Sequence, residues 1–165
     1  MMNYVDASDA PIVNTGQIKL HGAEAFAGMR KAGQLAAEAL DLMAAHAKPG
    51  VSTAELDRIA LEFARDNNAV PAPLHYRGYP KSICTSINHV VCHGIPSDKP
   101  LKEGEIVNID ITLIVDGWHG DSSRMYPIGE INRKAERLIE VTYESLMRGI
   151  AAVKPGATTG DIGYA

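Results

Sequence analysis

Apolar residues in the first third of the chain recur at spacings of three and four. One such stripe begins after Gly22 and continues to Lys48, and its members are Phe26, Met29, Gly33, Ala36, Leu40, Met43 and Ala47. This spacing places side chains on one face of an α-helix. Pro49 and Gly50 follow, and neither residue favours continuing a helix. The pattern therefore predicts an amphipathic helix over about residues 22–48.

A second amphipathic helix is predicted immediately after this stop. Ser52 followed by Glu55 has the spacing of a capping box. The apolar stripe of this helix comprises Leu56, Ile59, Ala60 and Phe63, and Asn67 and Asn68 end it. Residues 70–80, VPAPLHYRGYP, are rich in proline and predict a loop.

The hydrophobic period shifts toward two in the middle of the chain. Residues 82–92, 105–115 and 118–126 have the composition and alternation of strands. Asp116-Gly117, between the last two, is a strong signal for a two-residue hairpin turn. Helical spacing returns at about Arg133 and continues to Val153.

Two segments of the chain share one pattern. They are residues 47–60, AKPGVSTAELDRIA, and residues 153–165, VKPGATTGDIGYA. In each, the end of a predicted helix is followed by Lys-Pro-Gly, then by a Ser/Thr pair, and then by an acidic residue with an aliphatic one after it. Chance recurrence is one explanation, because Pro-Gly after a helix is common. An internal duplication is the other. A duplication would make 22–129 a first repeat and 132–165 the start of a second, truncated one.

The predicted hairpin brings two aspartates together. In its register Val115 faces Trp118 and Thr112 faces Asp121, so Asp110 points to the same face as Asp121. Diagonal neighbours of this kind have Cβ atoms about 7 Å apart. Two carboxylates so close favour a bound cation. The alternative is that Asp121 begins a turn and Asp110 is an exposed strand residue.

Two carboxylates suit hard or borderline divalent metals but do not complete a site, because such ions take four or more ligands. His93, in VVCHGIP, is the next candidate, and its alternative is an ordinary histidine at a strand end. Tyr76, Tyr79 and Cys84 lie in or near the proline-rich loop, where aromatic and sulfur-containing side chains also serve ordinary packing.

Composition places the chain among ordinary globular proteins. It has 165 residues, 45% hydrophobic and 22% charged, with a net charge of -4. That length fits one domain. The negative charge and the lack of a Lys/Arg cluster argue against nucleic acid as a partner. No signal peptide or membrane span is evident, and two cysteines without an export signal indicate free thiols in the cytoplasm.

These segments together resemble the type I methionine aminopeptidases of the bacterial type. The stretches that carry the resemblance are MRKAGQLAAEAL (29–40), KPGVSTAELDRIA (48–60), GYPKSICTSINHVVCHGIP (78–96), LKEGEIVNIDITLIVDGWHGDSSRMYPIG (101–129) and VKPG (153–156). The resemblance runs from about Lys19 to the end of the chain. It implies an α+β, pita-bread (creatinase/aminopeptidase) fold, with an antiparallel sheet, helices on its outer face and a second pseudo-symmetric half that is truncated here. Residues 1–18 would be an N-terminal arm and 19–165 the incomplete catalytic domain.

The resemblance also implies a site. Asp110 and Asp121 correspond to two ligands of a pair of divalent ions (Co, Mn, Fe or Zn), with Asp121 bridging them. His93 corresponds to a catalytic histidine that hydrogen-bonds the substrate. The pocket for the methionine side chain would be lined by Tyr76, Tyr79 and Cys84. Two departures are Arg77, where bacterial members usually have histidine, and His89, where glutamate is common.

The activity implied is removal of the initiator methionine from nascent proteins by metal-assisted hydrolysis in the cytoplasm. The resemblance also implies that the substrates are met at the ribosome and that the full-length protein is a monomer. The family takes its other ligands, one histidine and two glutamates, from the second half, so the 165 residues alone are expected to be inactive. One alternative is a non-catalytic pita-bread protein that binds peptides or partners. Another is a proline-directed peptidase of the same fold, which the cysteine-bearing segment ICTSINHVVCHGIP disfavours.

Overall fold

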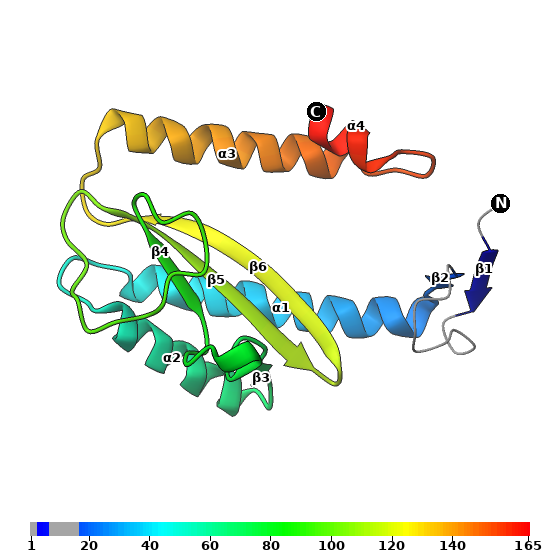
Figure 1. Ribbon diagram of the computed structural model, residues 1–165, viewed down its shortest axis with the longest axis horizontal. Coiled ribbons are helices and arrows are strands. Elements are labelled where there is room, and N and C mark those ends of the chain that lie inside the picture. Colours follow the sequence, from blue (N-terminus) through cyan, green and yellow to red (C-terminus); the bar gives the residue numbers. More distant parts are fainter. Residues whose placement is uncertain (1–2, 7–16) are drawn as a thin grey trace.

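The computed structural model describes residues 3–6 and 17–165, and Figure 1 shows its elements. Two short strands, β1 (Asn3–Asp6) and β2 (Gln17–Leu20), pair in parallel. The sequence did not predict them, because the first 18 residues show no periodicity. The rest of the proposed N-terminal arm, residues 1–2 and 7–16, lies outside the described residues.

The two predicted N-terminal helices are confirmed. The first, α1, spans Ala23–His46, and α2 spans Thr53–Asp66. The Ser52 hydroxyl accepts a hydrogen bond from the Glu55 backbone N–H at 3.2 Å, which satisfies one of the free donors of the α2 N-terminus. The Glu55 carboxylate instead pairs with Arg58, so the capping box is only half formed.

The central sheet is antiparallel and has one face covered by helices. Its strands are β3 (Val70–Pro71), β4 (Cys84–Ile87), β5 (Ile106–Val115) and β6 (Trp118–Pro127), and β5 pairs with the other three. Alternate β5 residues are buried in the main core with α1 and α2, namely Val107, Ile109, Ile111, Leu113 and Val115. As Figure 1 shows, α1 runs along the sheet with α2 beside it. The β5 residues that alternate with these buried ones, among them Asp110 and Thr112, point to the other face of the sheet.

The hairpin forms in the register expected from the sequence. Val115 pairs with Trp118 and Thr112 with Asp121. Asp116 and Gly117 have φ values of 50° and 84°, the pair of positive values that a type I′ turn requires. The Lys31 ammonium on α1 pairs with the Asp116 carboxylate at 2.7 Å, and both side chains are exposed.

Helix α1 approaches β6 closely. A Cβ added at Gly120 would lie 2.0 Å from the carbonyl oxygen of Ala32, so only glycine fits this crossing. Farther along β6, the buried Tyr126 hydroxyl donates to the Leu40 carbonyl oxygen at 2.6 Å. These contacts fix the distance between helix and sheet along most of the length of β6.

Two sequence predictions were wrong in extent. The strand predicted over 82–92 covers only Cys84–Ile87, because Asn88 turns into the left-handed region (φ 52°) and its backbone N–H donates to the Ile106 carbonyl. The predicted loop over 70–80 contains the short strand β3 and a 3-10 turn at Tyr76–Gly78. Pro71 is compatible with a strand there because β3 is short and lies at an edge.

The C-terminal helices repeat the local geometry of α1 and α2. Helix α3 spans Arg133–Ala152 and α4 spans Thr159–Tyr164. Gly50 and Gly156 have φ values of 90° and 86°. Backbone hydrogen bonds link Val51 N to Lys48 O at 3.2 Å, and Ala157 N to Lys154 O at 3.0 Å. The second turn ends in a reciprocal capping box between Thr158 and Asp161.

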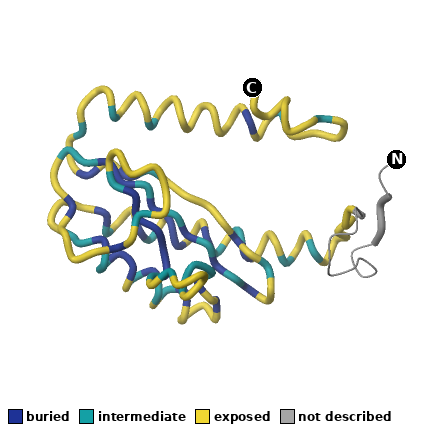
Figure 2. Tube along the Cα trace, in the orientation of Figure 1, coloured by how far each residue is buried: buried dark blue, intermediate teal, exposed yellow. Residues whose placement is uncertain are grey.

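The apolar stripe of α3 is exposed in the described structure. Figure 2 shows α3 as almost entirely exposed, and Figure 1 shows it separated from the sheet. Its main packing partner among the described elements is α4. Its large exposed apolar side chains are Leu138, Val141, Tyr143, Leu146, Met147 and Ile150. Among the described helices, none combines the length and apolarity needed to cross a bilayer.

Candidate active site

An open cleft of about 990 Å³ lies on the sheet face opposite α1 and α2. Its walls come from the loop after β3, from β4, from the segment after β4, and from the β5–β6 hairpin. The lining residues that the sequence singled out are Tyr76, Tyr79, Cys84, His93, Asp110 and Asp121. The structure therefore brings all six predicted site residues to one cleft.

Asp110 and Asp121 come from adjacent strands. Asp110 pairs with Ser123 and Thr112 with Asp121, so the two aspartates are diagonal neighbours on the cleft face. Asp110 is half-buried and Asp121 is exposed. The Thr112 hydroxyl donates to the Asp121 carboxylate at 2.8 Å, which orients it.

The electrostatics of the pair favour a cation. Burial, and then the charge of Asp121, raise the pKa of Asp110, while His93 opposes the shift. Within the described part of the chain, no hydrogen bond or ion pair satisfies the Asp110 carboxylate. A half-buried carboxylate without a partner is costly. A divalent ion between the Asp110 and Asp121 carboxylates would remove that cost of burial, so the two carboxylates fit a hard or borderline metal.

The carboxylate pair has too few ligands to hold a metal ion by itself. Across residues 3–6 and 17–165, no group of three or more His, Cys, Asp or Glu side chains could hold a metal ion. Divalent metals in proteins take four or more ligands. Asp110 and Asp121 alone therefore do not complete a metal site among the described residues.

His93 is exposed at the cleft on a segment that runs beside β4. The Thr85 backbone N–H donates to the Gly94 carbonyl at 2.8 Å, and the Gly94 N–H donates to the Ser86 hydroxyl at 3.1 Å. A Cβ at Gly94 would lie 2.1 Å from the Thr85 carbonyl oxygen, so the close approach requires glycine. His93 itself has φ 57°, in the left-handed region of backbone conformation. His93 lines the same cleft as Asp110 and Asp121.

Tyr79 and Cys84 form an uncharged wall of the cleft. The Tyr79 hydroxyl lies 3.0 Å from the Ile83 carbonyl oxygen and 3.1 Å from that of Gly94. Burial raises the pKa of Tyr79 and of the Cys84 thiol, so both groups stay neutral at neutral pH. Cys84 is buried and reduced, as expected, whereas the other free thiol, Cys92, is exposed.

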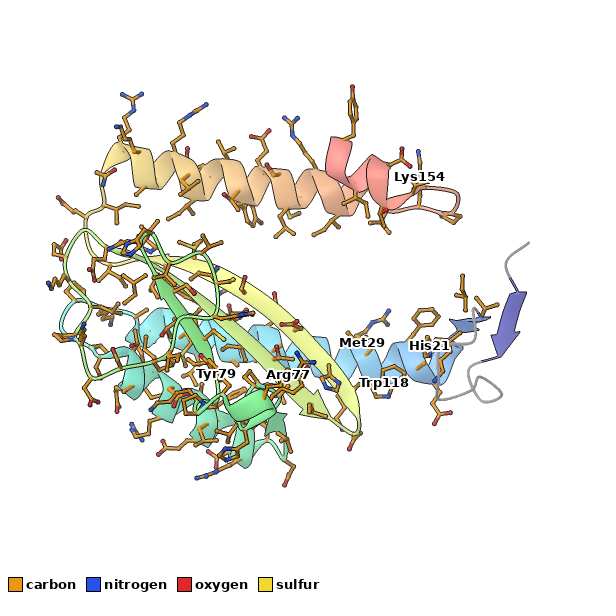
Figure 3. All side chains as sticks on the ribbon, viewed as in Figure 1. His21, Met29, Arg77, Tyr79, Trp118 and Lys154 are labelled. Atoms are coloured by element: carbon orange, nitrogen blue, oxygen red, sulfur yellow. The ribbon has the colours of Figure 1, made fainter. Side chains whose placement is uncertain are left out.

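Tyr76 and Arg77 lie at the rim. Tyr76 is exposed, and the Arg77 guanidinium lies over its ring at 5.4 Å from the centroid. Arg77 and Tyr79, both labelled in Figure 3, line the same cleft. Arg77 is itself a cleft residue, whereas His89 is exposed in the turn after β4 and is absent from the cleft lining.

Two polar lining residues, Thr112 and His119, were not singled out from the sequence as site residues. The hairpin register contained the signal for both. Thr112 is directly opposite Asp121, and His119 lies two residues before it, which places both on the face of the aspartates.

The chain is similar to known metallopeptidases. Residues 27–165 match metallopeptidase family M24. The chain is 60% identical over 148 residues to the methionine aminopeptidase of Rickettsia prowazekii (strain Madrid E), covering 90% of this chain and 57% of that protein. It is 54% identical over 139 residues to that of Escherichia coli (strain K12), covering 83% and 53%. The crystal structure of the Rickettsia prowazekii enzyme superposes with a TM-score of 0.87 at 60% identity, over 89% of this chain and 59% of that one.

The fold and the site define the class. An antiparallel sheet that carries helices on one face and a carboxylate pair on the other is the architecture of the pita-bread hydrolases, and the structural likeness confirms this expectation. The chain belongs to metallopeptidase family M24. Membership implies the use of a divalent metal. The chain spans about half the length of the relatives that it matches.

Proposed function

We propose that the protein to which these residues belong removes the N-terminal methionine from newly made polypeptides. The observation that carries this is the cleft, which joins a carboxylate pair suited to a metal with a neutral sulfur- and tyrosine-lined wall. The identity of 60% and 54% to proteins named methionine aminopeptidase supports the choice of substrate.

The side chain of the N-terminal methionine would rest against Tyr79 and Cys84, with Tyr76 at the rim. A thioether is polarizable and packs well on aromatic rings and on a thiol. Because Tyr79 and Cys84 stay protonated at neutral pH, this wall carries no charge that would require solvation. Apolar side chains of similar length would fit less well because they lack sulfur.

Asp110 and Asp121 would supply carboxylate ligands to two divalent ions, drawn from Co, Mn, Fe or Zn. When bound, such ions lower the pKa of water toward neutrality and polarise a peptide carbonyl. Thr112 would hold the Asp121 carboxylate in a fixed orientation through its 2.8 Å hydrogen bond. His93 would donate a hydrogen bond to the substrate beside the scissile peptide, holding the peptide and stabilising charge that develops on it.

We further propose that the described residues do not hydrolyse peptides alone. Two carboxylates cannot complete two ions that each take four or more ligands. The repeated geometry of the two Lys-Pro-Gly turns supports a first half-repeat over about 22–129 and the beginning of a second over about 132–165. The remaining ligands would then come from the second half. We place the active protein in the cytoplasm, as a monomer that meets its substrates at or near the ribosome, without a nucleic-acid or membrane partner.

The experiment uses the protein isolated from its native source and the peptides Met-Ala-Ser and Leu-Ala-Ser. We expect manganese- or cobalt-dependent release of methionine and little release of leucine. Asp121→Asn should lower the rate more than about a hundredfold, because even residues that only support a ligand cost about 10–100-fold. Asp116→Asn is the matched control: it neutralises an exposed aspartate of the same hairpin and should change little. Unchanged hydrolysis in Asp121→Asn would contradict the metal assignment, and binding without hydrolysis would favour a non-catalytic peptide-binding role.

A further inference from the structure

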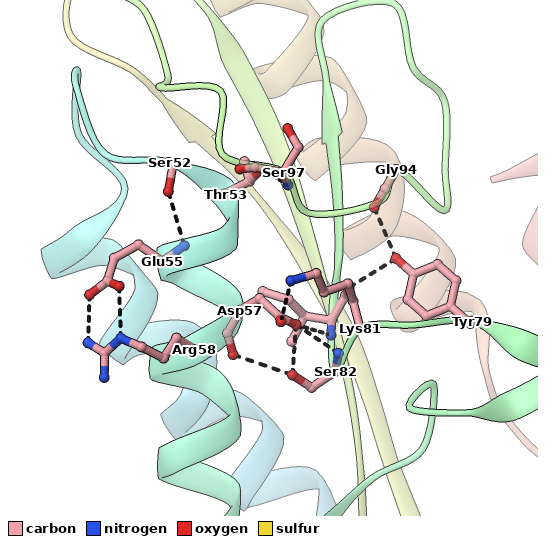
Figure 4. Close-up of polar contacts among 11 residues, drawn as sticks. Ser52, Thr53, Glu55, Asp57, Arg58, Tyr79, Lys81, Ser82, Gly94 and Ser97 are labelled. Atoms are coloured by element: carbon pink, nitrogen blue, oxygen red, sulfur yellow. Dashed lines mark hydrogen bonds and ion pairs between the residues drawn. The ribbon is translucent and has the colours of Figure 1, made fainter.

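Asp57 is a buried carboxylate of α2 that lies outside the carboxylate pair of the cleft. Its exposed fraction is 7%. Its Oδ1 accepts from the Ser82 N–H at 2.7 Å, from the Ser82 hydroxyl at 2.7 Å and from the Ile83 N–H at 3.2 Å. Figure 4 shows these contacts joining α2 to the segment before β4. Its other oxygen, Oδ2, lies 3.6 Å from the Lys81 ammonium.

The backbone that Asp57 holds has no strand partner. Residues 79–83 precede β4, which begins at Cys84. In the described structure no backbone carbonyl accepts from the N–H of Ser82 or Ile83. Buried N–H groups need an acceptor, and a carboxylate supplies a strong one. The Asp57 side chain therefore takes the place of the missing strand partner.

This held segment carries the neutral wall of the cleft. Tyr79 comes three residues before Ser82, and its hydroxyl contacts the carbonyl oxygen of Ile83, the second residue that Asp57 binds. Cys84 follows Ile83 directly and pairs with Asp110 in the sheet. A shift of Ser82 and Ile83 would thus move both wall residues relative to Asp110.

We propose that Asp57 is a positioning residue: its Oδ1 holds the backbone of Ser82 and Ile83 in place. The positions of the Tyr79 and Cys84 side chains in the cleft depend on this contact. The statement that Tyr79 and Cys84 bind the substrate's methionine side chain rests on the proposed function. The positioning itself does not.

Four variants separate the roles of the two Asp57 oxygens and of the Ser82 hydroxyl. Asp57→Ala removes every acceptor. Asp57→Asn keeps an Oδ1 that can accept all three hydrogen bonds, but it removes the charge and replaces Oδ2 with an NH2 donor that faces Lys81. Lys81→Met removes the 3.6 Å ion pair and leaves Oδ1 untouched, so it is the matched control. Ser82→Ala deletes the hydroxyl contact alone and gives a milder perturbation if Asp57→Ala does not fold.

The readout is the rate at which the buried Cys84 thiol reacts with the small neutral reagent methyl methanethiosulfonate. A Cys92→Ser background removes the other thiol of the chain. Rates are measured across low urea concentrations, beside global unfolding followed by circular dichroism. Local opening of the segment gives a rate that is nearly independent of urea, whereas global unfolding gives a steeply dependent one.

We expect Asp57→Ala to speed labelling of Cys84 at least about tenfold through a urea-independent opening, because two buried N–H groups lose their acceptor. Asp57→Asn and Lys81→Met should stay within about threefold of the parent, and Ser82→Ala should fall between. Labelling that only follows global unfolding would overturn the proposal, as would equal effects of Asp57→Ala and Asp57→Asn. Millimolar L-methionine in the same assay tests the proposed function separately: it should slow labelling of the parent, and failure to do so would count against the methionine pocket while leaving the Asp57 result intact.

Discussion

Gly120→Ala is the substitution whose cost can be worked most directly from the structure. The new Cβ would lie 2.0 Å from the Ala32 carbonyl oxygen, 2.2 Å from the Ala32 carbonyl carbon and 2.7 Å from the Gly33 nitrogen. Non-bonded heavy atoms normally keep about 3.5 Å. The helix and the strand would have to separate by about 1.5 Å, and all the opposing atoms belong to the α1 backbone.

Such a separation opens the core between α1 and β6. Overpacking a core costs about 1–3 kcal/mol, and the backbone on both sides places Gly120→Ala at the upper end, about 3 kcal/mol. For a chain of this size that corresponds to a melting temperature lower by about 6–12 °C. Urea unfolding followed by circular dichroism measures the free energy of unfolding directly.

Gly33→Ala is the matched control, because it makes the same chemical change one residue beyond the crossing point. An added Cβ there meets nothing within 4 Å, and alanine is the better helix former. We expect Gly33→Ala to stabilise by about 0.5–1 kcal/mol. If Gly120→Ala proved neutral, or if both variants destabilised equally, the close packing of α1 on β6 would be refuted.

Three further predictions concern buried and capping groups. Tyr126→Phe should cost about 1 kcal/mol through the lost hydrogen bond to Leu40, seen as a lower urea midpoint. Burial raises the pKa of Tyr126 from 10.0 to about 12, so its neutral form is favoured in the fold. That contribution is complete below pH 10 and is lost as the pH rises toward 12, and the loss should be absent in Tyr126→Phe when stability is followed against pH. Ser52→Ala should lower the unfolding free energy by about 1 kcal/mol, because α2 loses its N-cap acceptor. Burial and the Asp121 charge raise the pKa of Asp110, so its ionised form opposes folding at neutral pH. Asp110→Asn should therefore raise the urea midpoint of the metal-free chain at pH 7. An unchanged or lower midpoint would show that the ionised Asp110 carboxylate does not destabilise the fold.

The hairpin and the helices could be predicted from the sequence because their signals are local. Asp116-Gly117 specifies a turn with two positive φ values, and that turn fixes the register that places Asp110 and Asp121 together. The caps and Pro-Gly stops set the ends of α1 and α2 within a residue or two. Local chemistry was sufficient for these elements.

Features that depend on distant residues could not be predicted in this way. The extent of β4 depends on Asn88 bonding to Ile106 across the sheet, and the role of Asp57 depends on Ser82 lying beside α2. Neither pairing has a signature in the spacing of residues. The role of Gly120 likewise appears only once α1 crosses β6. Assignment of His93 and the cleft wall required the family resemblance, because spacing alone left ordinary packing open.

The claim that Asp110 and Asp121 hold the metal is tested most directly by adding Mn²⁺ to the chain and mapping paramagnetic broadening of backbone amide signals by NMR. Broadening reports the place of a bound ion even when affinity is weak. We expect broadening centred on Asp110, Thr112 and Asp121 that disappears in Asp121→Asn and persists in Asp116→Asn. Broadening centred on other carboxylates, or unchanged in Asp121→Asn, would contradict it.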